Sequence, residues 1–497
     1  MKSIVRSAIL VALCLFLFTP ETNASVNTNR IDGQNRFEVA VNVSKKGWSS
    51  AKTVVVTSSE AYADALAATP LAYLKNAPIL LTHSTSLTNV TSKRIKELRA
   101  SEVIIVGGPK SVSDSVIKSI KNLGISNVRR ISGANRFEVA ANIAKEMPST
   151  NRAIVTYGHT FADALSIAPY AARNRIPILL TEKNSVPSST RNIINSKGIK
   201  DTVVVGGENS VSAKVYNALP SAERIGGADR YEVAVNIIKK YNLSTSAPFM
   251  SNGSAFADAL SGSVLAAKTN SPILLTVSSG IPGPTVSLMK EKGIKNITIL
   301  GGTKSVTSAV TNRITAPLFG KRIVIDAGHG DQDSGAVGNG IQEKDVVLDV
   351  SKRLVNKLKN KDVVPYMTRS EDNFLELEER VEYAKSKNAD AFISVHANSF
   401  TSTSANGTET YWNSMYAGSQ SKSLATEIQS RLVTRLGTRD RGVKEANYYV
   451  IKNNKMPSVL VELAFISNSS DAKKLKDPSY RDKAAQAIYE GIDNYYK

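Results

Sequence analysis

Cysteine is nearly absent from this chain of 497 residues: it occurs once, at position 14, so an intramolecular disulfide framework is excluded. Histidine occurs only four times, which leaves few candidates for histidine-dependent chemistry. Beyond the N-terminal segment, no apolar run approaches the ~20 residues of a transmembrane helix. What is there is a hydrophobic fraction of 42% and a charged fraction of 21%, as in folded globular domains. At ~100–200 residues per domain, the length predicts several domains.

The N-terminal segment has the pattern of a secretory signal peptide. Lys2 and Arg6 form a basic start, an apolar run follows over residues 8–18, and Ala24 supplies a small residue at the cleavage position. We therefore predict that residues 1–24 are removed on export, and we expect no transmembrane segment after cleavage. The alternative, a short membrane anchor, is less favoured because the apolar run is shorter than a bilayer requires.

The chain has a large excess of positive charge, with 63 Lys and Arg against 43 Asp and Glu and a formal net charge of +20. Such an excess favours a polyanionic partner: a nucleic acid, an acidic membrane surface or an acidic wall polymer. The export signal argues against nucleic acid. The excess lies in residues 25–320, which carry 35 basic and 18 acidic side chains, whereas residues 321–497 carry 26 and 24. A role of the charge in solubility alone stays open.

Four sequence blocks occur three times, in the same order, within this basic region. The first block reads RIDGQNRFEVA at residue 30, RISGANRFEVA at residue 130 and RIGGADRYEVA at residue 224. The others are an aromatic residue followed by ADAL, the sequence PILLT, and an apolar run that ends in Gly-Gly. Self-similarity at this spacing predicts three repeat units, which we assign to residues 25–128, 129–222 and 223–316.

Each repeat alternates short apolar runs with segments of helical periodicity. In the first repeat, residues 53–57, 78–82 and 103–106 have the pattern of buried strands, and apolar positions within 37–44 and 61–68 follow a helical period. The alternation predicts an α/β fold with a parallel sheet covered by helices. The Gly-Gly pair after the third strand is more consistent with a tight turn than with a phosphate-binding loop.

These blocks resemble the type 2 cell-wall-binding repeat of secreted proteins from Gram-positive bacteria, over residues 28–314. The resemblance implies three α/β modules around a pseudo-threefold axis, in a protein secreted to the cell wall. It also implies that anionic wall polymers of the teichoic-acid type bind near the Pro-Ile-Leu-Leu segments. The polymer-binding candidates are Pro78, Ile79, Leu80, Leu81, Pro177, Ile178, Leu179, Leu180, Pro272, Ile273, Leu274 and Leu275. Several weak contacts in one chain suit a repetitive polymer.

A different pattern begins after the short linker Thr315–Gly320 and occupies residues 321–497. Apolar runs at residues 322–326, 391–395 and 458–461 have the pattern of buried strands. If these strands are parallel, their carboxyl ends meet at one crevice, where open sheets bind ligands. The sequence therefore predicts a second type of α/β domain with its site at that edge of the sheet.

Four polar residues interrupt this apolar pattern. His329 and His396 follow the first two strands, Glu343 begins a helix, and Glu462 lies where burial is expected. A buried carboxylate needs a metal, a proton or a partner. Two imidazoles and one carboxylate are a ligand set for catalytic Zn²⁺, and a second carboxylate suits proton transfer. Each residue also has an ordinary structural interpretation: His329 as a turn residue, Glu343 as an acid at a helix N-terminus, His396 as a core histidine.

Residues 322–497 resemble the zinc-dependent N-acetylmuramoyl-L-alanine amidases of the amidase type 3 family. The matching motifs are IDAGHG at residue 325, GIQEKD at 340, SVHAN at 394 and LVELAFISN at 460. The resemblance implies that His329, Glu343 and His396 hold zinc and that Glu462 is the catalytic acid/base. With the repeats, it implies a peptidoglycan hydrolase, an autolysin, that cleaves the amide bond between N-acetylmuramic acid and L-alanine of the stem peptide.

Two other functions are also considered for this sequence. A wall-bound structural or adhesive protein with a degenerate C-terminal fold is expected to lack a site residue, and all four are present. A zinc endopeptidase or carboxypeptidase acting elsewhere on the same peptide is excluded only by the resemblance. The other two histidines, His83 and His159, occupy positions that do not recur among the repeats, so we expect them at the surface.

Overall fold

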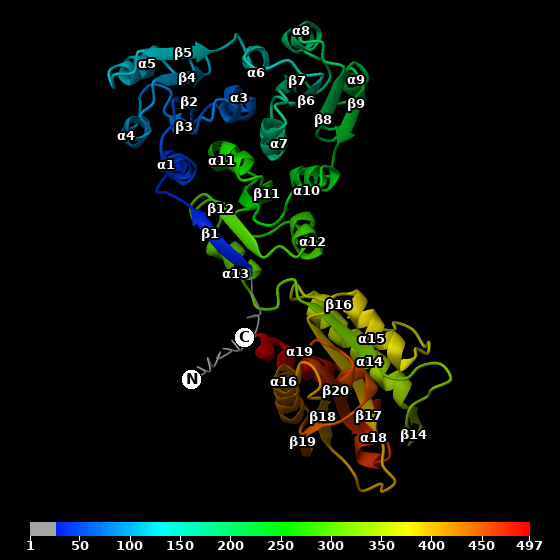
Figure 1. Cartoon of the computed structure of the whole chain (residues 1–497). Coiled ribbons are helices and arrows are strands. Elements are labelled where there is room, and N and C mark those ends of the chain that lie inside the picture. Colours follow the sequence, from blue (N-terminus) through cyan, green and yellow to red (C-terminus); the bar gives the residue numbers. More distant parts are fainter. Residues whose placement is uncertain (1–25) are drawn as a thin grey trace, which may run out of the picture.

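The computed structural model describes residues 26–497 and divides into two lobes, one holding the repeats and one the C-terminal domain (Figure 1). The predicted signal peptide, residues 1–24, lies outside the described residues. Within the described part of the chain, no helix combines the length and apolar character that a membrane crossing needs.

The repeat lobe is built from short strands and helices in alternation. Its strands are β1 (Asn27–Ile31), β2 (Thr53–Ser58), β3 (Ile79–Thr82), β4 (Glu102–Val106), β5 (Asn127–Ile131), β6 (Arg152–Tyr157), β7 (Ile178–Thr181), β8 (Asp201–Val205), β9 (Ala222–Ile225), β10 (Phe249–Asn252), β11 (Ile273–Thr276) and β12 (Asn296–Leu300). Its helices are α1 (Arg36–Gly47), α2 (Tyr62–Ala65), α3 (Ala68–Leu74), α4 (Asn89–Glu97), α5 (Asp114–Lys121), α6 (Arg136–Lys145), α7 (Ala162–Arg173), α8 (Ser188–Ser196), α9 (Ala213–Asn217), α10 (Arg230–Lys240), α11 (Ala257–Lys268), α12 (Gly283–Lys292) and α13 (Ser308–Ile314).

These strands form three parallel four-stranded sheets, which confirms the predicted α/β class. The sheet orders are β3-β2-β4-β5, β7-β6-β8-β9 and β1-β12-β10-β11. The three apolar runs of each repeat form the inner strands and one edge, as the sequence predicts. The fourth strand of each sheet was not predicted, because its residues are mostly polar. It is the start of the next repeat, and β1 closes the ring by pairing with β12.

The sheets are therefore offset by one strand from the sequence repeats, and the predicted boundary after residue 128 falls inside β5. An arginine on each added strand donates a hydrogen bond to the carbonyl of the first glycine of a Gly-Gly pair. These bonds of 2.7–2.9 Å join Arg30 to Gly301, Arg130 to Gly107 and Arg224 to Gly206. The glycines have φ between +102° and +124°, so the pairs are tight turns that an L side chain would strain.

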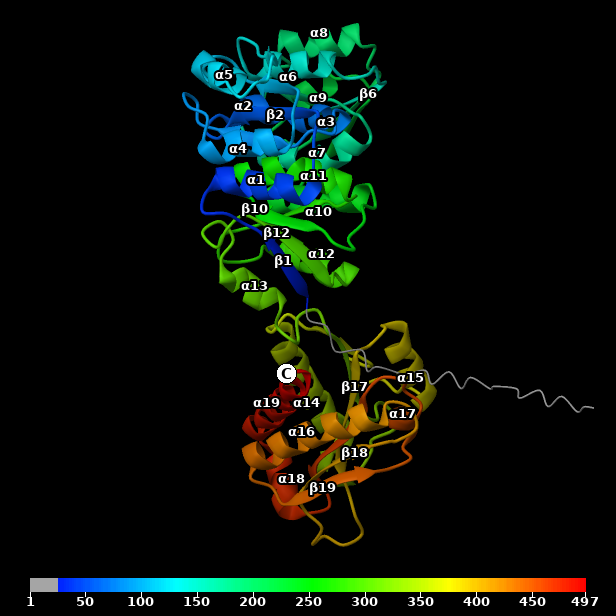
Figure 2. The ribbon, with the colours of Figure 1, turned by 60° about the vertical axis from the view of Figure 1, so that its left-hand side comes forward.

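The repeats surround a pseudo-threefold axis, as expected. Helices α3, α7 and α11, one from each repeat, contact one another at the centre, and Figure 2 shows them stacked within the lobe. The aromatic residues that precede the three ADAL sequences, Tyr62, Phe161 and Phe256, meet with ring centroids 5.4–6.1 Å apart. This shared aromatic cluster explains why an aromatic residue recurs at that position.

The Pro-Ile-Leu-Leu segments form the start of β3, β7 and β11 and the turn before each strand. All twelve residues predicted to bind polymer are buried, and Leu80, Leu179 and Leu274 are 0% exposed. Their apolar character therefore serves the cores of the sheets, and burial argues against direct contact with a wall polymer. Polymer binding by these segments stays a prediction.

The C-terminal domain contains one large sheet between helices. Its strands are β13 (Arg322–Ala327), β14 (Val337–Gly338), β15 (Ile341–Gln342), β16 (Val364–Met367), β17 (Ala391–Asn398), β18 (Thr408–Trp412), β19 (Asp440–Glu445) and β20 (Ser458–Phe465). Its helices are α14 (Glu343–Lys359), α15 (Leu377–Ser386), α16 (Gly418–Leu436), α17 (Tyr449–Lys452), α18 (Ser469–Lys476) and α19 (Pro478–Tyr496).

The large sheet has the order β16-β13-β17-β20-β18-β19, and only the β18–β20 pairing is antiparallel. Alternate residues along its strands face opposite sides of the sheet and pack into two separate cores. Ile323 and Ile325 pack with α14, α16 and α19, whereas Val324 packs with α15 and α17. Because β13, β17 and β20 are parallel neighbours, their carboxyl ends lie at one edge, as predicted.

The linker between the lobes is packed rather than loose. Leu318 enters the core of the C-terminal domain, and the next residue, Phe319, enters the core of the third repeat. The Asp362 carboxylate, just before β16, accepts from Arg313 at 2.8 Å and pairs with Lys290 at 3.3 Å. The repeats thus sit at the amino ends of β13 and β16. Figure 1 shows β14, which follows the opposite end of β13, far from the repeats.

Candidate metal centre and active site

The carboxyl edge of the large sheet brings the four predicted site residues to one place. His329 lies two residues beyond the end of β13, and His396 lies on β17, two residues before that strand ends. Glu462 lies on β20, where its Cα is paired in register with that of His396. Glu343 is the first residue of α14, which packs against β13 and β17.

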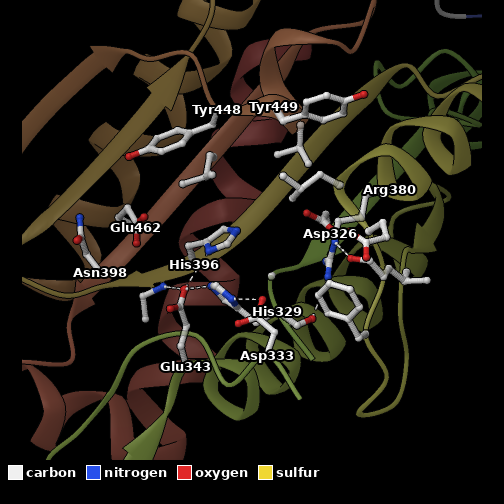
Figure 3. Close-up of a pocket in the computed structure, with 18 of the residues that line it drawn as sticks. Asp326, His329, Asp333, Glu343, Arg380, His396, Asn398, Tyr448, Tyr449 and Glu462 are labelled. Atoms are coloured by element: carbon white, nitrogen blue, oxygen red, sulfur yellow. Dashed lines mark hydrogen bonds and ion pairs between the residues drawn. The ribbon is translucent and has the colours of Figure 1, made fainter. Parts of the chain in front are cut away.

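Two histidines and one carboxylate converge closely enough to hold a metal ion. One ligand atom from each of His329, Glu343 and His396 lies within 4.8 Å of the others. Glu343 Oε1 lies 3.1 Å from His329 Nε2 and 2.9 Å from His396 Nδ1 (Figure 3). Both carboxylate oxygens also accept backbone N–H groups, from Ala397 at 3.0 Å and Ala336 at 2.8 Å, so the carboxylate is held from two sides.

The turn that carries His329 is shaped by a close approach and by backbone strain. A Cβ atom on Gly328 would lie 2.3 Å from His396 Cε1, so a side chain there would displace the second imidazole. His329 itself has φ of 61°, a left-handed conformation that non-glycine residues rarely adopt. Strain of this kind costs ~1–3 kcal/mol and collects at functional sites.

The imidazoles and the carboxylate stabilise one another's charge. Burial alone would raise the pKa of Glu343, but hydrogen bonds with His329 and His396 hold that pKa well below its usual range. Burial would lower the pKa of His329, but Glu343 and Asp333 raise it instead. Asp333 Oδ2 lies 2.8 Å from the outer nitrogen of His329, the position of a group that orients a metal-bound imidazole.

Glu462 differs from Glu343 because one oxygen of its carboxyl group lacks a hydrogen-bond partner. It is 8% exposed, and its Oε2 has no hydrogen-bond partner among the described residues. Burial raises the pKa of Glu462 well above its ordinary value, and the nearby charges of Glu343 and Glu409 raise it further. A buried carboxyl group with a raised pKa and an oxygen free of hydrogen bonds is suited to accepting and donating a proton in acid–base catalysis.

A buried ion pair lies under the strained turn and was not predicted from the sequence. Asp326, 1% exposed, accepts from Arg380 at 2.8 Å, from Thr368 at 2.7 Å and from Ser394 at 2.7 Å. The same guanidinium donates to the carbonyls of Ala327 and His329. The pair therefore ties the end of β13 to α15 and fixes the backbone of His329.

A second buried carboxylate beside the site was also missed. Glu409 is opposite Glu462 in the antiparallel register of β18 and β20 and is 2% exposed. It accepts from Asn398, and it pairs with Arg441 and Lys444 on β19. An acidic residue inside the strand sequence TETYW was the available signal, since a carboxylate in a buried strand needs partners.

A cleft of about 550 Å³ opens over the metal candidates and Glu462. Its rim is apolar and aromatic, formed by Phe374, Leu375, Leu377, Tyr448 and Tyr449. Figure 3 shows the two tyrosines on one side of His396 and Glu343 on the other. A small number of convergent polar groups inside an apolar rim is the usual form of a ligand site.

The remaining histidines lie apart from this cleft. His83 and His159 are in the repeats, with 49% and 41% of their side chains exposed, so the expectation that they are surface residues is confirmed. Each pairs with a glutamate, Glu60 or Glu182.

Comparisons with known proteins match both parts of the chain. Residues 323–494 match the family model described as N-acetylmuramoyl-L-alanine amidase. Residues 30–117, 130–216 and 224–311 match the model described as cell wall binding domain 2.

Some similar proteins match the whole chain and others match part of it. The chain is 48% identical to the N-acetylmuramoyl-L-alanine amidase LytC of Bacillus subtilis (strain 168), with all of both chains covered. It is 38% identical over 295 residues to an amidase enhancer of the same organism, which covers 59% of this chain and 41% of that protein. The solved structure of Cwp6 from Clostridium difficile is 32% identical, with a TM-score of 0.56 over 95% of this chain and 80% of that one.

Proposed function

Because the chain belongs to the N-acetylmuramoyl-L-alanine amidase family, we propose that His329, Glu343 and His396 hold a zinc ion and that Glu462 is the catalytic acid/base. The enzyme is an autolysin-type peptidoglycan hydrolase, and it cleaves the amide bond between N-acetylmuramic acid and L-alanine of the stem peptide. Its cell-wall-binding repeats indicate that it acts outside the membrane, in the wall.

The observation that carries the proposal is the convergence of two imidazoles and one ionised carboxylate at the floor of the cleft. This donor set fits catalytic zinc, which takes three protein ligands and leaves a position for water. Zinc dependence is general in this family. When bound, the ion would polarise the scissile carbonyl and lower the pKa of a water molecule.

Glu462 would move the proton. Its unpartnered Oε2 accepts the proton of the attacking water as the new carbon–oxygen bond forms. The same carboxyl group then donates that proton to the nitrogen of L-alanine as the carbon–nitrogen bond breaks. The products are a free lactyl carboxylate on the sugar and a stem peptide with a free L-alanine amino terminus. The raised pKa of Glu462 favours the second of these transfers.

The repeats would anchor the enzyme to anionic wall polymers of the teichoic-acid type. The net charge of +17 over residues 25–320 supports this, because it attracts a polyanion while residues 321–497 stay near neutral. We also propose that residues 1–24 act as a signal sequence and direct export of the chain. Three linked modules raise the effective concentration of each for the polymer.

Metal content tests the zinc site independently of turnover. We expect about one zinc per chain in the wild type by plasma mass spectrometry, and loss of that metal together with activity in His329→Ala. The matched control is His83→Ala, which removes an exposed imidazole of the first repeat and should keep both. Full activity in chelator-treated protein shown to be free of metal would refute the proposal.

A further inference from the structure

Exposed apolar side chains gather beside the cleft of the proposed active site. Eight large hydrophobic side chains are exposed among residues 26–497, and five of them belong to one region of the C-terminal domain. These five residues, each 41–56% exposed, form what we call the aromatic surface: Leu377, Met415, Tyr416, Tyr448 and Tyr449. Exposed apolar residues that are scattered singly are normal, but a group of them marks an interaction site.

The aromatic surface begins at the cleft itself. Leu377, Tyr448 and Tyr449 line the cleft as well as the surface. Leu377 begins α15 and Tyr449 begins α17, and these two helices pack against each other. The ring of Tyr448 meets that of Tyr411 on β18 edge-on, with centroids 5.1 Å apart. The aromatic surface is therefore continuous with the proposed active site.

The loop after β18 extends this surface away from the cleft. Asn413, which is buried, accepts from the Met415 N–H at 2.9 Å and donates to the Ala446 carbonyl at 2.7 Å. These bonds tie the loop of Met415 and Tyr416 to the segment just before α17. The loop is therefore held in place, although the two side chains that it presents are exposed.

A lysine on α15 lies near two tyrosines of the surface. Lys385 pairs with Glu382 at 2.6 Å, and Glu382 chiefly raises the pKa of Lys385. Tyr449 and Tyr416 also raise that pKa, so both hydroxyl groups lie near the same ammonium group. The five side chains of the surface carry no charge of their own, and the lysine beside them is paired. Such a surface suits an uncharged ligand better than a polyanion.

The surface extends from the side of the cleft where the sugar of the substrate is expected. Glu462 is the proposed donor to the L-alanine nitrogen, so the stem peptide lies on the Glu462 side of the scissile bond. In the view of Figure 3, Glu462 lies to the left of His396 and Tyr449 lies to the right. The sugar that carries the lactyl group therefore lies toward Tyr449, and the glycan strand continues from that sugar over the aromatic surface.

Tyrosine and aliphatic side chains also have the chemistry to bind N-acetylated sugars. The faces of a pyranose ring carry C–H groups that pack on aromatic rings, and a tyrosine hydroxyl remains available for hydrogen bonds at the ring edge. The methyl group of an N-acetyl substituent can be covered by leucine or methionine.

We propose that the aromatic surface binds the glycan strand beyond the sugar that carries the scissile bond, with sugar rings stacked on Tyr449 and Tyr416. This inference rests on the proposed function of the active site, and it names the part of the substrate that lies outside the cleft. The enzyme then favours stem peptides on long strands over those on single sugar units, because only a strand reaches Tyr416.

Hydrolysis of two soluble substrates tests the inference. One is a single disaccharide that carries a stem peptide, and the other is a strand of several such disaccharides without anionic polymer, with concentrations counted per stem peptide. Tyr416→Ala in the full chain should raise KM for the strand about two- to tenfold, the scale of one aromatic contact, and leave KM for the single unit unchanged. Tyr416→Phe keeps the ring and should restore the KM of the parent chain.

Phe400→Ala is the matched control, because it removes an aromatic ring that is 61% exposed from the loop after β17. It should leave the ratio of the two KM values as it is in the parent. Strands stripped of their peptides give a second measurement. They should inhibit hydrolysis of the single unit competitively, and about two- to tenfold more weakly in Tyr416→Ala than in the parent. The thermal unfolding temperature should be equal in both, since the Tyr416 side chain is exposed.

Equal KM values for the strand in Tyr416→Ala and in the parent would overturn the inference. A dimer of the parent chain that Tyr416→Ala dissociates, with the ratio of KM values unchanged, would also overturn it and assign the surface to a second copy of this chain. A parent chain that releases L-alanine amino termini from neither substrate would instead overturn the function on which the inference rests.

Discussion

The buried Asp326–Arg380 pair gives a prediction whose size follows from its contacts. Asp326→Asn keeps the shape of the side chain but removes the charge that faces Arg380 at 2.8 Å, and both side chains are at most 3% exposed. Burial alone would raise the pKa of Asp326, but Arg380, Thr368 and Ser394 hold it below its usual value, so the native residue is ionised. Removing one partner of a buried pair costs about 3–5 kcal/mol.

The same substitution should weaken the metal site. Arg380 donates to the carbonyl of His329, whose strained backbone depends on this support. Groups that orient a metal ligand typically contribute ~10–100-fold in metal affinity. We therefore expect Asp326→Asn to lose stability and zinc affinity together, although Asp326 is not a proposed ligand.

Urea unfolding measures the stability, with a reporter confined to the catalytic domain. The chain has two tryptophans, Trp48 in the first repeat and Trp412 on β18. In a Trp48→Phe background, fluorescence reports the C-terminal domain alone. Asp482→Asn is the control: its carboxylate pairs with Lys357 but is 48% exposed, so its loss should cost less than ~1 kcal/mol. A cost of less than ~1 kcal/mol for Asp326→Asn as well would refute the reasoning.

Three further predictions concern separate parts of the molecule. Glu462→Gln should keep its zinc and lose turnover by ~10²–10⁴-fold, since an amide cannot accept the proton of water; near-normal turnover would remove Glu462 from the mechanism. Asp163→Asn should raise the free energy of unfolding at pH 7.5 by about 3 kcal/mol, because burial raises the pKa of Asp163 from 3.8 to about 6. The folded state therefore binds this proton more tightly than the unfolded state, and the native chain loses stability as the pH rises from 4 to 6. Thermal unfolding of both chains should show this gain vanish below pH 4, and a gain that is independent of pH would contradict it. Asp362→Asn should loosen the packing between the lobes, so that protease cleaves residues 315–320 several times faster while hydrolysis of soluble muropeptide is unchanged; an unaltered cleavage rate would show that the ion pairs do not hold the linker.

The residues of the proposed active site were predictable because strand ends and burial patterns are local signals. His329 and His396 directly follow apolar runs, and the parallel arrangement of those runs determines that the two imidazoles meet. Glu462 was visible as a carboxylate inside a strand of apolar residues. The support from Arg380 was not visible, because α15 lies far along the chain from the turn that it holds.

In the repeats, local sequence patterns were a poorer guide to function. The Pro-Ile-Leu-Leu segments recur because each forms a buried strand, so the fold alone accounts for their recurrence, and their binding to polymer stays a prediction. The strands that begin each repeat were missed because sequences such as NTNRI are polar, and only their pairing with the preceding repeat makes them strands. The cleft that Asp163 lines between the second and third repeats could not be predicted, since its walls come from different repeats.

The chemistry of the released fragments tests the central claim most directly. Purified walls are digested with the full chain, and the new termini are identified by amino-group labelling and mass spectrometry, with Glu462→Gln as the inactive control. The account predicts new amino termini that are L-alanine, matched by free lactyl carboxylates on intact glycan strands. New amino termini at other residues of the stem peptide, with the bond between the sugar and L-alanine intact, would contradict it.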